Sequence, residues 1–423
     1  MKILLTGDLH LGRSSSKVPP TVRREEVRAA AAWGRIVELA LQEQVGAVLL
    51  SGDVADQDNT FWEAIGPLER GISRLAEAKI RTVAVAGNHD YDVLARLADQ
   101  LPPKHFALLG RGGKWERLTI EEAGRPVLHI DGWSFPRARV QQSPLDDYAP
   151  GRDPAVPILG LLHGELDVAG SPYAPLELTR LQGLAPAGWL LGHVHAPRLI
   201  HGPPWVLYPG SPQALDPGEP GPHGPWVAEV AAGALGAPGH RFLSSILYEQ
   251  HTIDVSQARD QTELESVLLE GIREEADRIA GEAHPNLVHV SLRLSVVGNT
   301  PVSDCVGAVA DRLVQDLSLP VGSASVGVDS IDVHTMPEID LVEYASSHSA
   351  PGAVARLLLE LERPEVSPEA ARVIRQARAA LERIEHHRDF TPLKRRDVTD
   401  QRARDHLRTQ AQALLTQLVT QTA

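Results

Sequence analysis

Short apolar runs alternate with helix-like patterns over the first 240 residues, and this rhythm is the strongest constraint on the fold. The run Ile3 to Leu5 is followed by apolar residues at helical spacing between Val27 and Ala40, and then by the run Ala47 to Leu50. Because such alternation is typical of strands joined by helices, it predicts an α/β fold with a largely parallel sheet. We expect further strands at Val83–Val85, Val127–Ile130, Ile158–Leu162, Trp189–Leu191, Val206–Tyr208 and Val227–Val230.

Two stretches rich in Gly and Pro indicate where the first domain ends. They cover residues 203–225 and 233–239, and such stretches are typical of linkers. Strand and helix patterns then alternate as β-α-β-α-β from Leu247 to His334, and only helical patterns follow Pro337. The sequence therefore predicts a domain over residues 1–240, a small α+β domain over residues 245–335 and a helical region over residues 338–423.

Composition limits the class of protein. The chain has 423 residues, 43% hydrophobic and 23% charged, which excludes a mostly disordered chain and favours more than one domain. No apolar run approaches the roughly 18 residues that span a bilayer. The single Cys305 cannot form an internal disulfide, so no oxidising compartment is indicated. We expect a cytoplasmic protein.

The formal net charge of −14 argues against a nucleic-acid partner, because phosphate backbones bind basic surfaces. A cation site contributes carboxylates of its own, however, and a second subunit can supply basic surface. Basic residues outnumber acidic ones between Arg363 and Arg408, most densely at Lys394-Arg395-Arg396. That run fits a DNA phosphate contact or a solvated flank of a helix.

Five polar motifs in the first 200 residues each follow a predicted strand. Because the carboxyl ends of parallel strands meet at one edge of a sheet, their side chains are expected to converge. Carboxylates, an amide and imidazoles without thiolate suit two divalent ions such as manganese, iron or zinc. The motifs are Asp8-Leu9-His10, Gly52-Asp53-Val54-Ala55-Asp56, Gly87-Asn88-His89-Asp90, His163-Gly164-Glu165 and Gly192-His193-Val194-His195.

The spacing within the motifs supports a metal site. In Asp-x-His and His-x-His, side chains at i and i+2 of an extended segment point the same way and can reach one ion together. Glycines before Asp53, Asn88 and His193 permit tight turns. Each motif alone is weak, since Asp-x-His is usually a polar strand end and a single His163 can be a buried structural imidazole. The complete set in order favours a site.

The motif set resembles the calcineurin-like metallophosphoesterase superfamily, whose motifs run D-x-H, G-D-x-x-D, G-N-H-D/E, H and G-H-x-H. Within it the chain is similar to the SbcD-type DNA repair nucleases, through Thr6 to Gly12 and Tyr208 to Pro212. The segments Leu161–Leu166, Tyr173–Pro175 and Glu219–Gly224 look more like the YhaO-type branch of that family. The resemblance implies a four-layer α-β-β-α sandwich, a small α+β capping domain that holds DNA, and C-terminal helices.

The resemblance also implies roles for the motif residues. Asp53 would bridge two manganese ions. His89 would act as general acid without binding metal, and Asp90 would orient the His89 ring. The implied activity is manganese-dependent exonuclease and endonuclease hydrolysis of DNA in repair and recombination, by an activated water and without a covalent enzyme intermediate. The implied ligands are Asp8, His10, Asp53 and His195 for the first ion, and Asp53, Asn88, His163 and His193 for the second.

The implied partners are DNA, as double-stranded ends, single strands or hairpins, an SMC-like ATPase of the SbcC type, and a second copy of the chain. Two apolar stripes on the C-terminal helices would dock on the ATPase or pack on the chain's own small domain. Seven apolar residues lie where this family forms homodimers, although they also fit a core: Phe61, Trp62, Leu68, Ile72, Leu75, Leu94 and Leu97. His223 stands where the YhaO-type branch usually has lysine, and a DNA contact there would depend on pH.

Two other functions remain open from the sequence. One is a small-molecule phosphodiesterase or protein phosphatase on the same catalytic domain, against which the long C-terminal region argues. The other is a scaffold that retains the fold without the chemistry, against which the complete set of donors and His89 argue. Cleavage of a simple phosphodiester but not of DNA would favour the first, and lack of bound metal would favour the second.

Overall fold

The computed structural model describes residues 1–56, 61–149, 155–282, 285–385 and 398–420, without the side chains of residues 61–63, 385 and 420. Residues 1–251, 274–294 and 313–330 form one compact unit, and residues 252–273, 295–312 and 331–423 form a second. The predicted three-domain boundaries stay predictions. The basic run Lys394–Arg396 lies outside the described residues.

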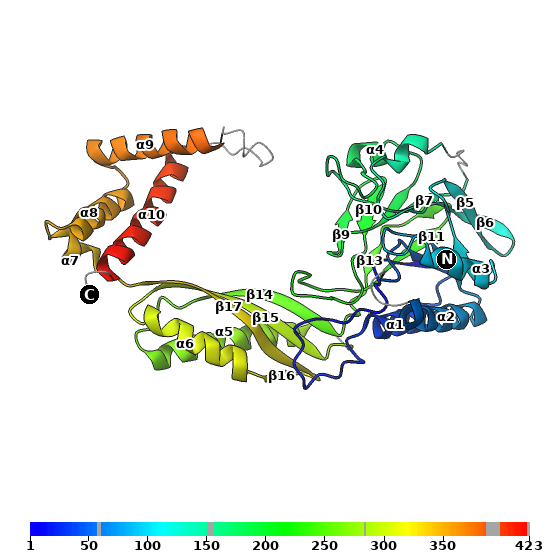
Figure 1. Ribbon diagram of the computed structural model, residues 1–423, viewed down its shortest axis with the longest axis horizontal. Coiled ribbons are helices and arrows are strands. Elements are labelled where there is room, and N and C mark those ends of the chain that lie inside the picture. Colours follow the sequence, from blue (N-terminus) through cyan, green and yellow to red (C-terminus); the bar gives the residue numbers. More distant parts are fainter. Residues whose placement is uncertain (57–60, 150–154, 283–284, 386–397, 421–423) are drawn as a thin grey trace. The chain divides into compact units, whose positions relative to one another are not determined.

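Two sheets lie wholly within the first unit, and the first of them begins at the N-terminus (Figure 1). Its strand order is β12-β11-β1-β2-β3-β4, and β13 pairs with β11. Strands β1 to β4 run parallel, whereas β11 is antiparallel to β1. The strands are β1 (Lys2–Thr6), β2 (Ala47–Leu50), β3 (Arg81–Ala84), β4 (Phe106–Leu108), β11 (Trp226–Ala231), β12 (Ala234–Leu235) and β13 (Gly239–His240).

The second sheet has the order β5-β6-β7-β8-β10-β9. Its four central strands are parallel, and β5 and β9 pair antiparallel at the edges. The register sets His163 beside Gly192, so two of the polar motifs leave neighbouring strands side by side. The strands are β5 (Glu116–Glu122), β6 (Arg125–Trp133), β7 (Ile158–His163), β8 (Gly188–Gly192), β9 (Arg198–Ile200) and β10 (Trp205–Tyr208).

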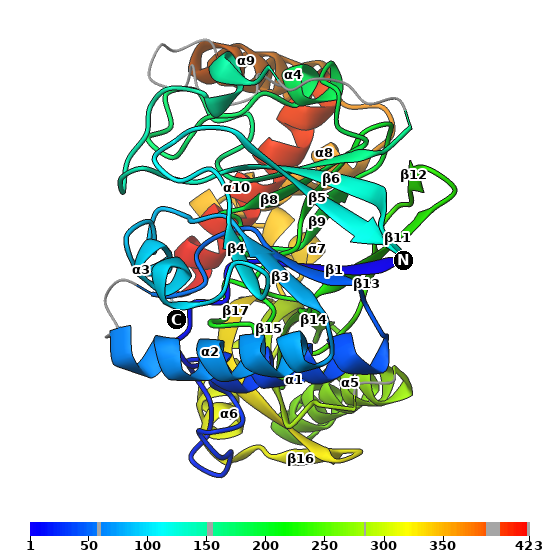
Figure 2. The ribbon, with the colours of Figure 1, turned by 90° about the vertical axis from the view of Figure 1, so that its right-hand side faces the viewer.

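Alternating side chains of the strands build the layers. In β1, Leu4 packs under the helices α1, α2 and α3, whereas Ile3 and Leu5 face the second sheet and pack in one core with Leu161 and Leu190. The outer face of the second sheet is covered by a short helix, a 3-10 turn and loops. Figure 2 shows the sequence of layers. The helices are α1 (Ala29–Gln42), α2 (Phe61–Glu77), α3 (Val93–Gln100), α4 (Leu178–Gln182) and the 3-10 turn η1 (Pro144–Asp147).

The predicted four-layer α-β-β-α sandwich is therefore confirmed, with a fourth layer made largely of loops. The apolar positions considered for a homodimer contact are core residues of α2 and α3: Leu68, Ile72, Leu75, Leu94 and Leu97 are at most 1% exposed. They pack in the helical core with Trp33, so these side chains are not available to a second copy. The side chains of Phe61 and Trp62, from the same prediction, lie outside the described residues.

The Gly- and Pro-rich stretches are not linkers. Residues 203–225 and 233–239 belong to the first unit, and β11, between the two stretches, is hydrogen-bonded to β1. A third sheet follows with the order β14-β15-β17-β16. It realises the predicted β-α-β-α-β pattern and adds the short β16. The elements are β14 (Ile246–Asp254), α5 (Gln261–Gly281), β15 (His289–Thr300), α6 (Ser303–Asp316), β16 (Leu319–Val321) and β17 (Ala324–Pro337).

The last part of the second unit is helical, as predicted. Helix α8 packs on α10 through Leu358 and Leu415, and Ile374 of α9 joins a second small core with Ala403 of α10. The sequence predicts an apolar stripe on α10 made of Ala403, Leu407, Ala411, Leu414 and Leu418. This stripe is wrong at one position, because Leu414 is 47% exposed and Leu415 is buried. None of the described helices is long and apolar enough to cross a bilayer. The helices are α7 (Leu341–Ala345), α8 (Ala350–Glu362), α9 (Pro368–Glu385) and α10 (Asp400–Thr420).

Candidate metal centre

The polar motifs leave the carboxyl ends of strands in both sheets and meet where the sheets face each other. Asp8 and Asp53 follow the paired strands β1 and β2, and His193 follows β8 beside His163 at the end of β7. The backbones approach closely, since a Cβ on Gly192 would lie 2.1 Å from the Ser51 carbonyl oxygen. The convergence predicted from strand order is thus produced by two sheets rather than one.

Four of the candidate ligands have left-handed backbone, which departs from the extended geometry assumed from the sequence. The φ angles are 48° at Asp8, 46° at His10, 48° at Asp53 and 101° at His193. Such conformations are uncommon for residues with a side chain, and they concentrate at functional sites. Turns, rather than the i, i+2 alternation of a strand, therefore aim these side chains at one another.

Glycines make room for these turns, as the sequence predicts. A Cβ at Gly87 would lie 2.1 Å from Oδ1 of Asp53, and a Cβ at Gly52 would lie 2.8 Å from Nδ1 of His163. Gly52 also has a φ of 95°, which a side chain would strain. Backbone of one motif can thereby lie directly against the donor atoms of another.

The first group of donors consists of Asp8, His10 and His195, whose ligand atoms all lie within 4.8 Å of one another. The Nε2 atoms of His10 and His195 are 3.0 Å apart. Both carboxylate oxygens of Asp8 accept the backbone N–H of His193, at 2.9 and 3.2 Å, which ties the β1 motif to the β8 motif.

The second group consists of Asp8, Asp53 and His163, again within 4.8 Å. His163 is fully buried, and its Nδ1 donates to the Ser51 carbonyl at 3.0 Å, which directs Nε2 toward Asp53 Oδ2 at 3.3 Å. Asn88 Oδ1 lies 3.0 Å from the same Nε2 and 3.3 Å from Nδ1 of His193. All seven predicted ligands thus gather in one place, with Asp8 common to both groups.

Burial and neighbouring charges tune these donors. Burial lowers the pKa of His10 to about 3 and that of His193 to about 4, so both imidazoles are neutral at pH 7. Burial raises the pKa of Asp8 to about 6. At Asp53 and His163 the effect of burial is outweighed by their mutual attraction, which lowers the pKa of Asp53 and raises that of His163 to about 9.

His89 differs from the donors around it. Its side chain is 39% exposed, and its ring lies edge-on to His10 with centroids 5.4 Å apart. Its backbone N–H donates to Asp53 Oδ1 at 2.9 Å, so the ring is anchored beside the donors without joining either group. A partly exposed imidazole at this position can reach a substrate.

The structure assigns a different contact to Asp90 from the one predicted. Asp90 is fully buried, and its carboxylate accepts the backbone N–H groups of Gly87 at 2.7 Å and of Val54 at 2.6 Å. It therefore holds the Asp53 turn in place. The carboxylate beside the His89 ring is Asp56, whose Oδ1 lies 3.5 Å from Nδ1. Both Asp56 and Asp90 are in the motifs, but sequence spacing does not show which one faces the ring.

Two residues of the 209–225 loop change the interpretation of that stretch. Glu219 accepts a hydrogen bond from Nδ1 of His195 at 2.7 Å, a contact that sequence reasoning missed because the residues are 24 positions apart. His223 is 0% exposed, and Nδ1 lies 2.6 Å from the Ser211 carbonyl oxygen. The condition under which the sequence would make a DNA contact at His223 sensitive to pH is therefore not met, since a fully buried ring cannot touch a phosphate backbone.

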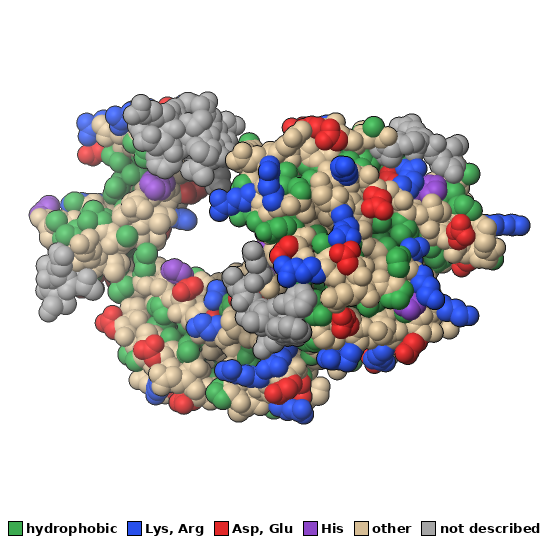
Figure 3. Space-filling view, turned by 45° about the vertical axis from the view of Figure 1, so that its right-hand side comes forward, with side chains coloured by type: hydrophobic (Ala, Val, Ile, Leu, Met, Phe, Trp, Pro, Cys, Tyr) green, Lys and Arg blue, Asp and Glu red, His purple; other side chains and the backbone are tan. Residues whose placement is uncertain are grey.

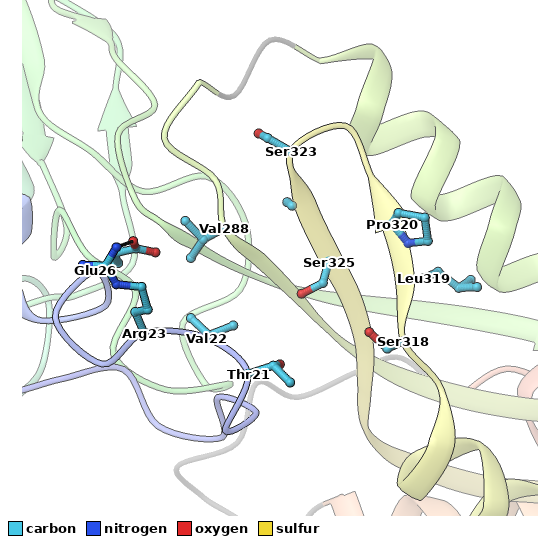
Figure 4. Close-up of a pocket in the computed structure, with 11 residues that line it drawn as sticks. Thr21, Val22, Arg23, Glu26, Val288, Ser318, Leu319, Pro320, Ser323 and Ser325 are labelled. Atoms are coloured by element: carbon cyan, nitrogen blue, oxygen red, sulfur yellow. Dashed lines mark ion pairs between the residues drawn. The ribbon is translucent and has the colours of Figure 1, made fainter.

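A pocket of about 510 Å³ lies elsewhere in the first unit, between residues 21–26 and the β16–β17 hairpin (Figure 4). Arg23 and Glu26 form an ion pair of 3.4 Å at its edge. Among the described residues its lining includes none of the predicted ligands. On the face drawn in Figure 3, acidic and basic side chains are interspersed rather than collected into one basic field.

The donor set fits a pair of divalent cations. Imidazoles, carboxylates and an amide oxygen converge. The facing Nε2 atoms of His10 and His195 can share one hydrogen, or both can turn their lone pairs to a cation. The sandwich and these donors define a phosphoesterase domain of the metal-dependent class. The family model for calcineurin-like phosphoesterases matches residues 1–197. This part of the chain is therefore similar to the calcineurin-like metallophosphoesterases.

Three individual relatives match between 35% and 70% of the chain. An uncharacterized metallophosphoesterase, YhaO of Bacillus subtilis, is 26% identical over 301 residues, which are 70% of this chain and 71% of that protein. The DNA double-strand break repair protein Mre11 of Methanopyrus kandleri is 25% identical over 51% of this chain and 49% of its own length. The Mre11 of Methanosarcina mazei is 30% identical over 35% of this chain and 22% of its own. Among solved structures, the calcineurin-like phosphoesterase YfkN from Bacillus subtilis has 14% identity and a TM-score of 0.37, covering 66% of this chain and 98% of that one.

Proposed function

We propose that this chain is a metal-dependent nuclease that hydrolyses DNA phosphodiesters. The observation that carries the proposal is the partly exposed ring of His89 beside two groups of metal donors that are buried except for His195. Buried donors retain ions, whereas an exposed imidazole is free to exchange a proton with a substrate oxygen. This combination suits hydrolysis better than storage or structural binding of metal.

In this proposal Asp8, His10, Asp53 and His195 hold one ion, and Asp53, Asn88, His163 and His193 hold the other. The ions, most suitably manganese, supply charge neutralisation at the phosphate and activation of water. His89 donates a proton to the departing sugar oxygen, and Asp56 at 3.5 Å holds the ring so that its other nitrogen faces the substrate. Asp90 keeps the Asp53 turn in place through backbone N–H groups.

DNA is the proposed substrate because two of the relatives are named as DNA double-strand break repair proteins. The chain also continues beyond residue 197 into the third sheet and the helices α7 to α10, which a minimal phosphodiesterase does not need. A role in DNA repair and recombination, as the nuclease subunit of an SbcCD-like complex, follows from this proposal.

The test is cleavage of end-labelled duplex, single-stranded and hairpin DNA by the purified chain with manganese, with Asp53→Ala prepared identically. Cleavage by the parent alone supports the proposal, and the product ladder gives the polarity. A chain that holds two ions and cleaves a chromogenic phosphodiester, but no DNA even with an ATPase partner, would be a small-molecule phosphodiesterase. A chain that binds no metal would be a scaffold.

We propose further that the helical region binds an SMC-like ATPase of the SbcC type. Ile384 on α9 is 52% exposed and Leu414 on α10 is 47% exposed, so both apolar side chains have surface left for a partner helix. Ile384→Asp with Leu414→Asp should abolish co-purification with a co-expressed ATPase, whereas Val168→Asp, at a residue 45% exposed in the first unit, should not. Intact co-purification of the double variant would overturn this surface.

A homodimer is the remaining part of the proposal. The buried core positions of α2 and α3 do not contribute to it, so it requires other surface of the chain. Light scattering of the purified chain during size-exclusion chromatography measures this directly. A mass of 45.8 kDa at all concentrations would show a monomer and remove the dimer from the proposal.

A further inference from the structure

The loop after β10 wraps around His195 from two sides. The backbone N–H of Ser211 donates to the His195 carbonyl at 3.0 Å, and the Glu219 carboxylate accepts from the His195 ring at 2.7 Å. Gly210 permits this approach, because its φ is 76° and a Cβ there would lie 2.5 Å from the His195 carbonyl oxygen. Both the backbone and the ring of His195 are thus fixed by residues 210–219.

The Glu219 carboxylate is itself held rigidly. Glu219 is 7% exposed, and its Oε2 accepts the Ser211 hydroxyl at 2.8 Å and the Leu215 backbone N–H at 2.8 Å. His223 lies behind Ser211, with Nδ1 2.6 Å from the Ser211 carbonyl oxygen. Since each oxygen has a defined partner, Glu219 can present Oε1 to His195 in only one orientation.

This arrangement decides which nitrogen of His195 carries the proton. A carboxylate accepts and does not donate, so the ring nitrogen that faces Oε1 must be Nδ1–H. The other nitrogen, Nε2, then carries the lone pair, which accepts a hydrogen bond from Nε2–H of His10 at 3.0 Å when no cation is bound. Hydrogen bonds of this kind set the tautomer and orientation of metal-binding imidazoles.

We propose that Glu219 is a positioning residue of the metal centre, which fixes His195 as the Nδ1–H tautomer so that Nε2 is available to a divalent cation. Glu219 does not touch the ion or the substrate in this role and acts through His195 alone. The inference rests on the proposed function for the presence of metal, but the tautomer of His195 follows from the contacts of the protein itself.

The test compares full-length Glu219→Ala and Glu219→Gln with Glu275→Ala. Glu275 is a matched control because it is also 7% exposed and pairs with Arg278 at 2.7 Å. Titration calorimetry with manganese alone should show that Glu219→Ala weakens binding at the site that contains His195 about 10- to 100-fold. Glu219→Gln retains an acceptor oxygen and should lose less, and Glu275→Ala should bind as the parent does.

The second readout is the tautomer, by ¹⁵N spectra of histidine-labelled protein at pH 9 without metal, with His195→Gln to assign the signal. The parent should show the Nδ1–H pattern at His195, and Glu219→Ala should shift it toward the Nε2–H form. Unchanged metal affinity or an unchanged tautomer in Glu219→Ala would overturn the proposal. If the parent chain does not cleave DNA, but Glu219→Ala still weakens manganese binding and shifts the His195 tautomer, the nuclease function is refuted and the positioning role is supported.

Discussion

The Nε2 atoms of His10 and His195 face each other at 3.0 Å, although the two residues are 185 positions apart in the sequence. Their immediate surroundings differ. Burial lowers the pKa of His10 to about 3, whereas at His195 the effect of burial is outweighed by the Glu219 hydrogen bond, which raises its pKa. The His10 ring is therefore neutral at pH 7 and keeps one nitrogen with a lone pair.

Metal affinity should increase with pH up to about 9. The pKa of His163 is raised to about 9, so its ring carries an extra proton at neutral pH that a cation must displace from Nε2. The association constant should rise about tenfold per pH unit between 7 and 9. Calorimetry in two buffers with different ionisation enthalpies measures the released proton directly. Equal heats in both buffers would show that no proton leaves.

The stability of the protein in a chelator should change in the opposite direction. A pKa raised from 6.5 to about 9 means that the folded state holds the His163 proton more tightly than the unfolded chain does. This contribution is fully present below pH 6.5 and is lost as pH rises through 9. The melting temperature in EDTA should therefore fall over that interval, and His163→Gln should flatten the profile. A parent curve as flat as that of the variant would contradict the assignment.

His89→Ala should leave metal content unchanged and lower turnover at least about 100-fold, because it removes the general acid but no metal ligand. Atomic absorption gives the metal content, and cleavage of DNA or a chromogenic diester gives the rate. His105→Ala is a suitable control, since His105 precedes β4 at the opposite end of the sheet from the motifs. Loss of metal from His89→Ala would show that His89 is a ligand.

Asp90→Ala should lower both stability and metal affinity. It leaves the buried N–H groups of Gly87 and Val54 without an acceptor, which costs about 1–3 kcal/mol for each unsatisfied group. Denaturant unfolding and calorimetry with manganese measure the two effects. If Asp90 instead oriented His89, only turnover would fall while the unfolding midpoint and metal affinity stayed at parental values.

Gly160→Ala should destabilise the second sheet. A Cβ at this position would lie 2.1 Å from the indole ring of Trp189, which fills the outer face of the sheet. Overpacking of this kind costs about 1–3 kcal/mol. The matched control is Gly34→Ala in α1, where a Cβ meets nothing within 4 Å and should raise stability by roughly 0.5–1 kcal/mol. Urea unfolding should show a lower free energy of unfolding for Gly160→Ala and a higher one for Gly34→Ala than for the parent chain.

Local patterns of apolar and polar residues were enough to predict the buried strands, most helices and the ligands of the metal centre. Apolar runs such as Ile158–Leu162 predict buried strands because full burial on both faces requires continuous apolar residues, and the polar motifs that follow them supplied all seven predicted ligands. Helical spacing predicted α5, α6 and the C-terminal helices because a helix that buries one face repeats apolar residues every three or four positions. Edge strands such as β5, with an exposed face, carry a weaker pattern and were not predicted.

Tertiary structure decided what depends on distance through space. No periodic pattern in the sequence indicates the left-handed turns at Asp8 and His10. The same is true of the position of Asp56, rather than Asp90, beside the His89 ring, and of the contact between Glu219 and His195. The stretch 203–225 has the composition of a linker, because glycine and proline serve tight turns in a site loop as well as in a hinge. Sequence by itself determined the strands and the chemical types of the donors, and packing of the two sheets determined which atoms meet.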